Sequence, residues 1–94
     1  MEIRFYREPS SGQPHISSHA VSEDEVADVL EAPGEDRPGR EGTRVAIGQT
    51  SGGRYLRVIY VAEPDSDSAF VVTAYELKAK PLLAYRGRMR RRHG

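Results

Sequence analysis

Residues 54–76 read RYLRVIYVAEPDSDSAFVVTAYE, and this stretch decides the fold. It contains the two most hydrophobic runs of the chain, residues 55–62 and 69–75, which are rich in the branched and aromatic side chains that favour β-strands. The polar segment EPDSDS between them is typical of a hairpin connection. We therefore predict two antiparallel strands at the centre of a sheet.

Side-chain alternation divides these two strands into two faces. A continuous apolar face requires three cross-strand pairs, in which Tyr60 faces Phe70, Val58 faces Val72 and Leu56 faces Ala74. The opposite face carries side chains that are polar or amphipathic, namely Tyr55, Arg57, Thr73 and Tyr75. We interpret this second face as the functional one.

The composition indicates one small globular domain over residues 1–94, with 37% hydrophobic and 30% charged residues. The chain has no cysteine, which excludes disulfides, thiolate metal sites and cysteine nucleophiles. The first residues, MEIRFYREPS, lack the apolar stretch of a signal peptide, and no run reaches membrane-spanning length. We therefore expect a cytoplasmic protein without a membrane partner.

A formal net charge of zero conceals an uneven distribution along the chain. Residues 1–36 hold nine acidic and two basic side chains, whereas residues 37–94 hold twelve basic and five acidic ones. Such asymmetry is consistent with a polyanionic partner for the basic half, and equally with neutralisation of one half by the other in the fold.

Residues 21–32 have the clearest helical pattern of the chain. Ser22 and Glu25 form an S-x-x-E capping box at its start, and the Pro-Gly pair at 33–34 ends it. The buried stripe of this helix is expected to consist of Val26, Val29 and Leu30.

Two further strands are predicted, a short one over residues 2–6 and another within 43–50, with a polar loop over 34–42. A two-residue turn at 52–53 pairs Ile47 with Val58 and Val45 with Tyr60, whereas a three-residue turn sets Ile47 against Arg57. We favour the two-residue turn because it pairs apolar residues with each other. It also puts Arg44 on the same sheet face as Arg57.

After Glu76 the pattern changes to a helical period, with Pro81 at a first helical position and Leu82, Tyr85 and Met89 on one side. Gly87 weakens this helix, so the basic tail 86–94 is expected to fray in its last turns. The element order β-α-β-β-β-α predicts an α+β fold, with an antiparallel sheet of three to four strands and helices packed on one face.

Three segments together resemble a known family. HAVSEDEVADVLEAPG is followed by RVAIGQTSGGRYLRVIYV and then by VVTAYE. In this order and spacing, over roughly residues 15–88, they resemble the BrnT-like toxins, which belong to the RelE/ParE superfamily. Residues 19–22 correspond to the first motif of that family, residues 48–50 to the second, and residues 53–54 to the third.

The resemblance implies a RelE-like fold and a type II toxin-like, metal-independent ribonuclease that cleaves mRNA, free or bound to the ribosome. It also implies neutralisation by a cognate antitoxin. We expect no cofactor. The chain departs from the family pattern at Tyr75, where many members have arginine, and at Ala20, where glycine is usual. An arginine at position 75 would contact phosphate, so its replacement leaves open an alternative function, a non-catalytic RNA- or protein-binding module on the same fold.

Metal-free RNA cleavage needs a base, an acid and cations that stabilise the developing charge. The catalytic candidates are His19, Arg54, Arg57, Tyr75 and Lys78. Further basic residues are candidates for nucleic-acid contact: Arg44, Lys80, Arg86, Arg88, Arg90, Arg91 and Arg92.

Each of these candidates has a structural alternative. His19 can serve only as a hydrogen-bonding loop residue, Arg57 can lay its methylenes on the sheet with its head in water, and Tyr75 can be an ordinary strand aromatic. The RGRMRRRHG tail can be a solvated end or a docking point for an acidic antitoxin segment. His15 and His19 have the spacing of a metal pair, but they precede the helix and have no evident third ligand, so no metal site is expected.

Overall fold

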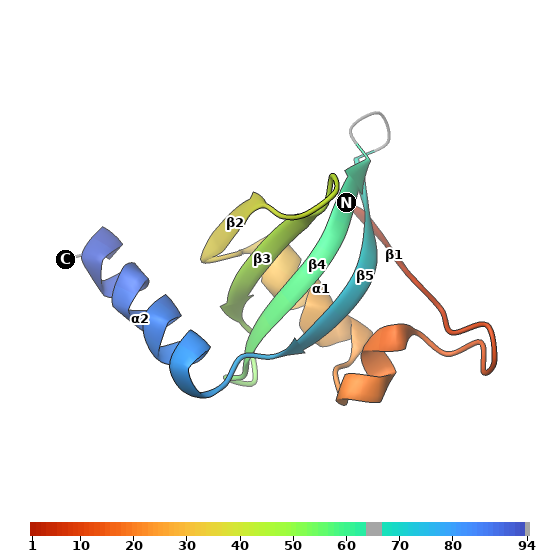
Figure 1. Cartoon of the computed structure of the whole chain (residues 1–94), viewed down its shortest axis with the longest axis horizontal. Coiled ribbons are helices and arrows are strands. Elements are labelled where there is room, and N and C mark those ends of the chain that lie inside the picture. The colour runs from red at the N-terminus through yellow and green to blue at the C-terminus, as the bar shows by residue number, and fades with distance from the viewer. Residues whose placement is uncertain (64–66, 94) are drawn as a thin grey trace.

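The computed structural model of this protein describes residues 1–63 and 67–93. Its elements are, in chain order, β1 (Glu2–Phe5), the 3₁₀ helix η1 (His15–His19), α1 (Glu23–Glu31), β2 (Glu35–Pro38), β3 (Arg44–Gln49), β4 (Tyr55–Glu63), β5 (Ser68–Glu76) and α2 (Ala79–His93). The strands form one sheet in the order β1-β5-β4-β3-β2, in which β1 is parallel to β5 and the other neighbours are antiparallel (Figure 1).

The predicted α+β class is confirmed, but the sheet is mixed and has five strands instead of three to four antiparallel ones. The two central runs and the strands expected near residues 2–6 and 43–50 are present. The predicted connection between the central strands includes residues 64–66, which lie outside the described residues.

β2 occupies residues 35–38 of the predicted loop 34–42, so the prediction is wrong for these four residues. This strand pairs antiparallel with β3, from Glu35 opposite Ile47 to Pro38 opposite Arg44. Its residues are mostly exposed, because an edge strand is held by backbone hydrogen bonds along one side and needs no apolar alternation. The polar composition that indicated a loop therefore also suits an edge strand.

The β3–β4 register is displaced by one residue from the prediction. Ile47 lies opposite Arg57, as the three-residue turn requires. Two predicted pairs are therefore wrong: Ile47 with Val58 and Val45 with Tyr60.

The physical reason for this register is that both faces of β3 are buried. Ala46 and Gly48 face α1, and a Cβ atom at Gly48 would lie only 3.3 Å from Val29 Cγ1, so the small residues leave room for the helix. Ile47 faces the other way and is buried against Tyr85 of α2. The pairing of apolar residues across the hairpin therefore does not indicate the correct register, because apolar side chains of β3 point to both faces of the sheet.

β5 contains a bulge that changes its register against β4. Ile59 pairs with Thr73 whereas Tyr60 pairs with Val71, so Val72 is an extra residue, and Val71 and Ala74 are both buried in the core. Three predicted pairs are therefore wrong: Tyr60 with Phe70, Val58 with Val72 and Leu56 with Ala74. Arg57 nevertheless lies opposite Tyr75, so the side chains of the predicted functional face remain together.

α1 follows the prediction closely. Ser22 Oγ accepts a hydrogen bond from the amide of Glu25, and the Glu25 carboxylate accepts one from the amide of Ser22, which completes the capping box. The predicted stripe is buried: Val26, Val29 and Leu30.

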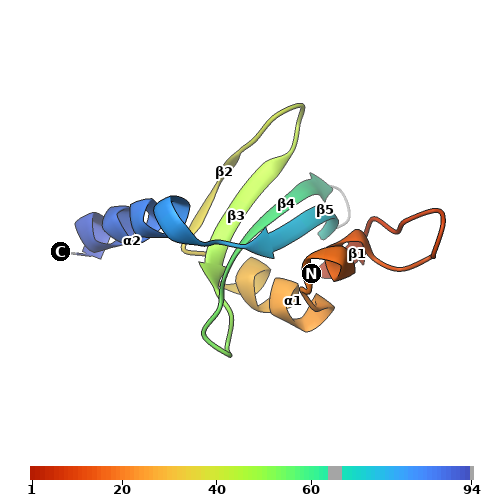
Figure 2. The same cartoon turned by 60° about the horizontal axis from the view of Figure 1, so that its bottom comes forward.

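The two helices lie on opposite faces of the sheet, as Figure 2 shows, so the prediction of helices on one face is wrong. The core against α1 includes Val26, Val29, Leu56 and Val58. The core against α2 consists of Val45, Ile47, Leu77 and Tyr85. Each face of β3 carries apolar side chains, and each requires a cover that excludes water.

α2 begins at Ala79 and includes Gly87, so the tail from residue 86 is helical as far as His93. Its predicted apolar side packs on the sheet, where Tyr85 is buried and Leu82 and Met89 are partly buried. Neither helix in residues 1–63 and 67–93 has the length and apolar character that a membrane crossing requires.

Candidate nucleic-acid interface on the open face of the sheet

In the part of the chain that the structure describes, no helix covers most of the face of β4 and β5 opposite α1, because α2 lies to one side (Figure 1). We call this surface the open face. Two cross-strand pairs lie on it, Arg57 with Tyr75 and Ile59 with Thr73. All four residues are half-buried.

Three of the five catalytic candidates lie next to one another at this face. Arg57 of β4 is directly opposite Tyr75 of β5. The exposed His19, at the end of η1, lies at the edge of the sheet with its ring centroid 6.0 Å from that of Tyr75. An imidazole, a phenol and a guanidinium thus form a row, which supplies proton donors and acceptors beside a cation.

Two polar atoms of the open face are buried without a protein hydrogen bond. Among the described residues, Arg57 Nε and Thr73 Oγ1 have no such partner. Buried donors that lack a protein partner are uncommon and are normally satisfied by water or a ligand. Arg57 is therefore suited to receiving an anion.

A groove of about 610 Å³ adjoins Arg57 between β4 and the β2–β3 hairpin. Three arginines line it, Arg37, Arg40 and Arg57, together with one acid, Glu41. The sequence pattern does not indicate Arg37 and Arg40, because the polar composition of residues 34–42 predicts a loop. Their position follows from the pairing of β2 with β3, which no pattern in the sequence indicates.

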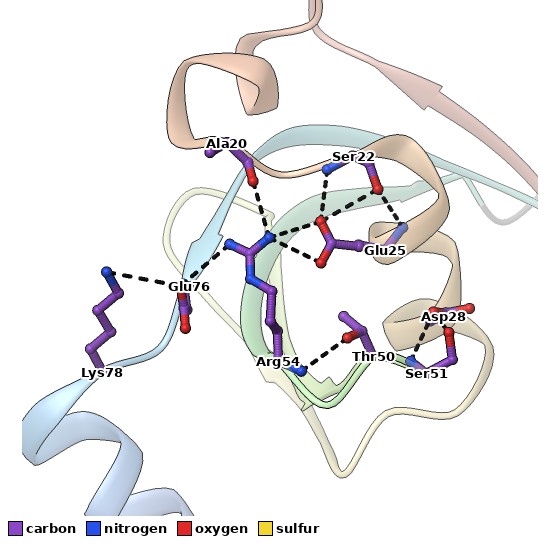
Figure 3. Close-up of polar contacts among 9 residues, drawn as sticks. All are labelled: Ala20, Ser22, Glu25, Asp28, Thr50, Ser51, Arg54, Glu76 and Lys78. Atoms are coloured by element: carbon purple, nitrogen blue, oxygen red, sulfur yellow. Dashed lines mark hydrogen bonds and ion pairs between the residues drawn. The ribbon is translucent and has the colours of Figure 1, made fainter.

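Arg54 lies on the α1 side of the sheet, away from the open face (Figure 3). Its Nη1 donates to the carbonyl of Ala20 and to both carboxylate oxygens of Glu25, each at 3.0 Å, and its Nη2 donates to Glu76 at 3.4 Å. Lys78 approaches the same Glu76 carboxylate at 3.8 Å. Arg54 thus connects the start of α1 to β4 and β5, and its catalytic role stays a prediction.

Arg44 also lies on the α1 side, opposite Tyr60, so the prediction that it shares a face with Arg57 is wrong. The one-residue displacement of the hairpin register is the cause. Arg44 Nε donates to Asp36 at 2.9 Å, and the Tyr60 hydroxyl donates to the same carboxylate at 2.5 Å. Burial, together with this hydrogen bond, raises the pKa of Tyr60 above its ordinary value.

The arginines of α2 divide into anchors and exposed cations. Arg88 forms an ion pair with Glu35 of β2, and Arg92 Nη1 donates to the carbonyl of Gly34 at 2.8 Å. The hydrogen bond from Arg88 lowers the pKa of the Glu35 carboxyl below its ordinary value. Like Arg92, the other basic side chains of α2 are exposed, namely Lys80, Arg86, Arg90 and Arg91.

No protein family, curated protein or solved structure matches this chain. The resemblance to the BrnT-like toxins therefore stays a prediction. In residues 1–63 and 67–93, no three His, Asp or Glu side chains are grouped so as to hold a metal ion. His15 Nδ1 instead contacts the carboxylate of Glu8, and the His15 ring lies 5.3 Å from that of His19.

Proposed function

We propose that this protein binds single-stranded RNA on the open face and cleaves it without a metal ion, as a type II toxin-like ribonuclease. The observation that carries the proposal is the row of His19, Tyr75 and Arg57 beside a groove lined by arginines. Arginine binds phosphate well, and exposed strand aromatics offer surfaces on which unpaired bases stack. The substrate is mRNA, free or on the ribosome.

The chemistry is attack of a ribose 2′-hydroxyl on the adjacent phosphorus, with departure of the 5′ oxygen. The products are a 2′,3′-cyclic phosphate and a 5′-hydroxyl. Imidazole accepts protons near neutral pH, so His19 takes the proton of the 2′-hydroxyl, and the Tyr75 hydroxyl protonates the leaving oxygen. Arg57 faces the developing charge of the phosphorane and stabilises it.

A cognate antitoxin is part of the proposal. A partner that covers the arginine-lined groove with acidic side chains would block RNA and would match the charge of the groove.

The decisive assay uses purified protein and end-labelled single-stranded RNA in the presence of a chelator. We expect cleavage that leaves a 2′,3′-cyclic phosphate and is abolished by 2′-O-methylation at the scissile nucleotide. Tyr75→Phe and His19→Gln should each lower the rate by about 10²–10⁴-fold, and Arg57→Gln by about 10²–10³-fold. Arg7→Gln is the matched control, because Arg7 lies outside the open face and donates to the carbonyl of Gly12.

Intact RNA in this assay, with normal growth and undegraded total RNA after induced expression, would contradict the ribonuclease proposal. The second candidate function would then apply: the protein is a non-catalytic module that binds RNA or protein on the same face. One observation favours it: Arg54 and Lys78, two of the catalytic candidates, are engaged by Glu25 and Glu76. Binding of RNA without cleavage by the wild type would establish this second function.

A further inference from the structure

A separate hollow of about 280 Å³ lies between α2 and the sheet, at the start of β4. It is lined by Gln49, Tyr55, Tyr85, Arg86, Met89 and Arg90. This volume is close to the lower end of the range found for small-ligand sites, about 300 Å³. The hollow is therefore large enough for one planar ring system and its substituents.

The walls of the hollow combine aromatic, thioether and cationic groups. The rings of Tyr55 and Tyr85 meet edge to face, with centroids 6.0 Å apart and planes at 65°, so they do not stack on each other. The Arg86 guanidinium lies over the Tyr55 ring at 5.4 Å. Flat π surfaces, a polarizable sulfur and two arginines suit a planar, electron-rich ring attached to an anionic group.

The hollow adjoins the site at Arg57. Tyr55 and Arg57 point to the same face of β4 and are two residues apart, which corresponds to about 6.6 Å along a strand. A chain of nucleotides that has one phosphate at Arg57 thus brings a neighbouring nucleotide to the hollow.

We infer that this hollow binds the base of a nucleotide next to the one held at Arg57, with Arg86 and Arg90 against its phosphate, and so determines which base is preferred there. The inference rests on the proposed function, because it names the base-recognition site of the same RNA surface. It adds Tyr55 and Met89 to the residues that contact RNA.

The chain has two methionines, Met1 and Met89, so methyl-labelled methionine gives two NMR signals. Met89 reports on the hollow, and Met1, next to the strand at the far edge of the sheet, serves as the internal control. The probes are adenosine 5′-monophosphate, uridine 5′-monophosphate and inorganic phosphate. We expect saturable shifts of the Met89 signal with the nucleotides, stronger binding of one base than the other, and much smaller shifts with phosphate alone.

Tyr55→Leu keeps the apolar bulk of the wall but removes the ring, and should weaken nucleotide binding by about 5- to 150-fold. Tyr55→Phe keeps the ring and should bind as the wild type does. Arg7→Gln, whose side chain lies outside both sites, should leave the Met89 shifts unchanged. An unchanged amide spectrum in each variant shows that the fold is retained.

Several outcomes would overturn the inference. They are a Met89 signal that moves equally with inorganic phosphate, equal binding by Tyr55→Leu and the wild type, or no Met89 shift with an RNA that does bind the open face. The last outcome leaves the proposed function intact. Nucleotide-dependent Met89 shifts without any cleavage or binding of RNA would support the base site and contradict the proposed function.

Discussion

Arg54, just before β4, and Arg57, within it, have different roles because the side-chain alternation of the extended chain directs them to opposite faces. Arg54 lies on the α1 side and forms ion pairs with Glu25 and Glu76. Arg57 lies on the open face, and its buried Nε has no hydrogen-bond partner among the described residues. From the sequence, both arginines are catalytic candidates. In the structure, only Arg57 lies on the open face without an acidic partner for its Nε among the described residues.

We predict that Arg54→Gln lowers the free energy of unfolding by about 1–2 kcal/mol, because it removes charge-assisted hydrogen bonds from partly exposed carboxylates. Arg57→Gln should change the same quantity by no more than about 0.5 kcal/mol. Urea unfolding of the two variants measures this. A larger loss for Arg57→Gln than for Arg54→Gln would contradict the assignment.

At the scale of elements, the position of α2 depends on a close contact with the segment before β2. A Cβ atom at Gly34 would lie 1.8 Å from the hydroxyl oxygen of Tyr85, a side chain that is only 4% exposed. Tyr85 cannot move away from such a Cβ atom without leaving the core in which it is buried. The same burial raises the pKa of the Tyr85 hydroxyl above its ordinary value. Glycine at this position is therefore required for the docking of α2.

We predict that Gly34→Ala destabilises the protein by about 1–3 kcal/mol through overpacking and speeds amide exchange in α2 more than in α1. Tyr85→Phe removes the clashing oxygen and should restore part of the stability in the double variant. Urea unfolding and hydrogen exchange of both single variants and the double variant test this. Additive losses in the double variant would exclude the contact as the cause.

The pair of Glu35 and Arg88 makes the docking of α2 sensitive to acid. The pKa of Glu35 is lower in the folded protein than its ordinary value of 4.5, because Arg88 donates a hydrogen bond to the carboxylate. The folded state thus binds the proton less well than the unfolded state. The stabilisation by this pair is full above the ordinary pKa and is lost as the pH falls through the folded pKa.

We predict that the wild type loses more stability than Glu35→Gln when the pH falls from 5 toward 3. The free energy of unfolding of each protein is measured as a function of pH. The difference between the two proteins reports on this pair alone, because other carboxylates with lowered pKa values, such as Glu63 and Asp28, are present in both. Parallel pH dependence of the two proteins would show that the pair contributes nothing.

The elements themselves could largely be predicted, and their mutual arrangement could not. The central strands and the capped α1 follow from local patterns, hydrophobic alternation and the S-x-x-E box. The registers depend instead on Gly48 beneath α1 and on the bulge at Val72, which are settled by packing between distant segments. The candidate site could be predicted only in part, for the same reason. Alternation along β4 and β5 places Arg57 and Tyr75 on one face, whereas the positions of Arg37 and Arg40 depend on the pairing of β2 with β3.

At the scale of the whole molecule, the uneven charge along the chain is partly neutralised within the fold. Three basic residues of the second half pair with acids of the first: Arg54 with Glu25, Arg44 with Asp36 and Arg88 with Glu35. The arginines of the groove face a single acidic neighbour in its lining. The fold thus neutralises part of the asymmetry, and the basic lining of the groove is what a polyanionic partner would match.

We predict a steep salt dependence of binding to single-stranded RNA, with a slope of log K against log salt of about −0.7 for each phosphate contacted. Arg37→Gln should reduce this slope by about 0.7, and Arg7→Gln should leave it unchanged. Fluorescence anisotropy over a range of salt concentrations measures both. Equal slopes for Arg37→Gln and the wild type would exclude the groove from the RNA path.

The central claim, that the open face binds single-stranded RNA, is tested most directly by an NMR titration of the ¹⁵N-labelled protein with a non-cleavable 2′-O-methyl RNA. We predict saturable amide shifts at Arg57, Thr73 and Tyr75, with little change along α1, whose residues lie on the other side of the sheet. Shifts confined to α1, or no shifts at RNA concentrations that saturate other single-strand binders, would contradict the account.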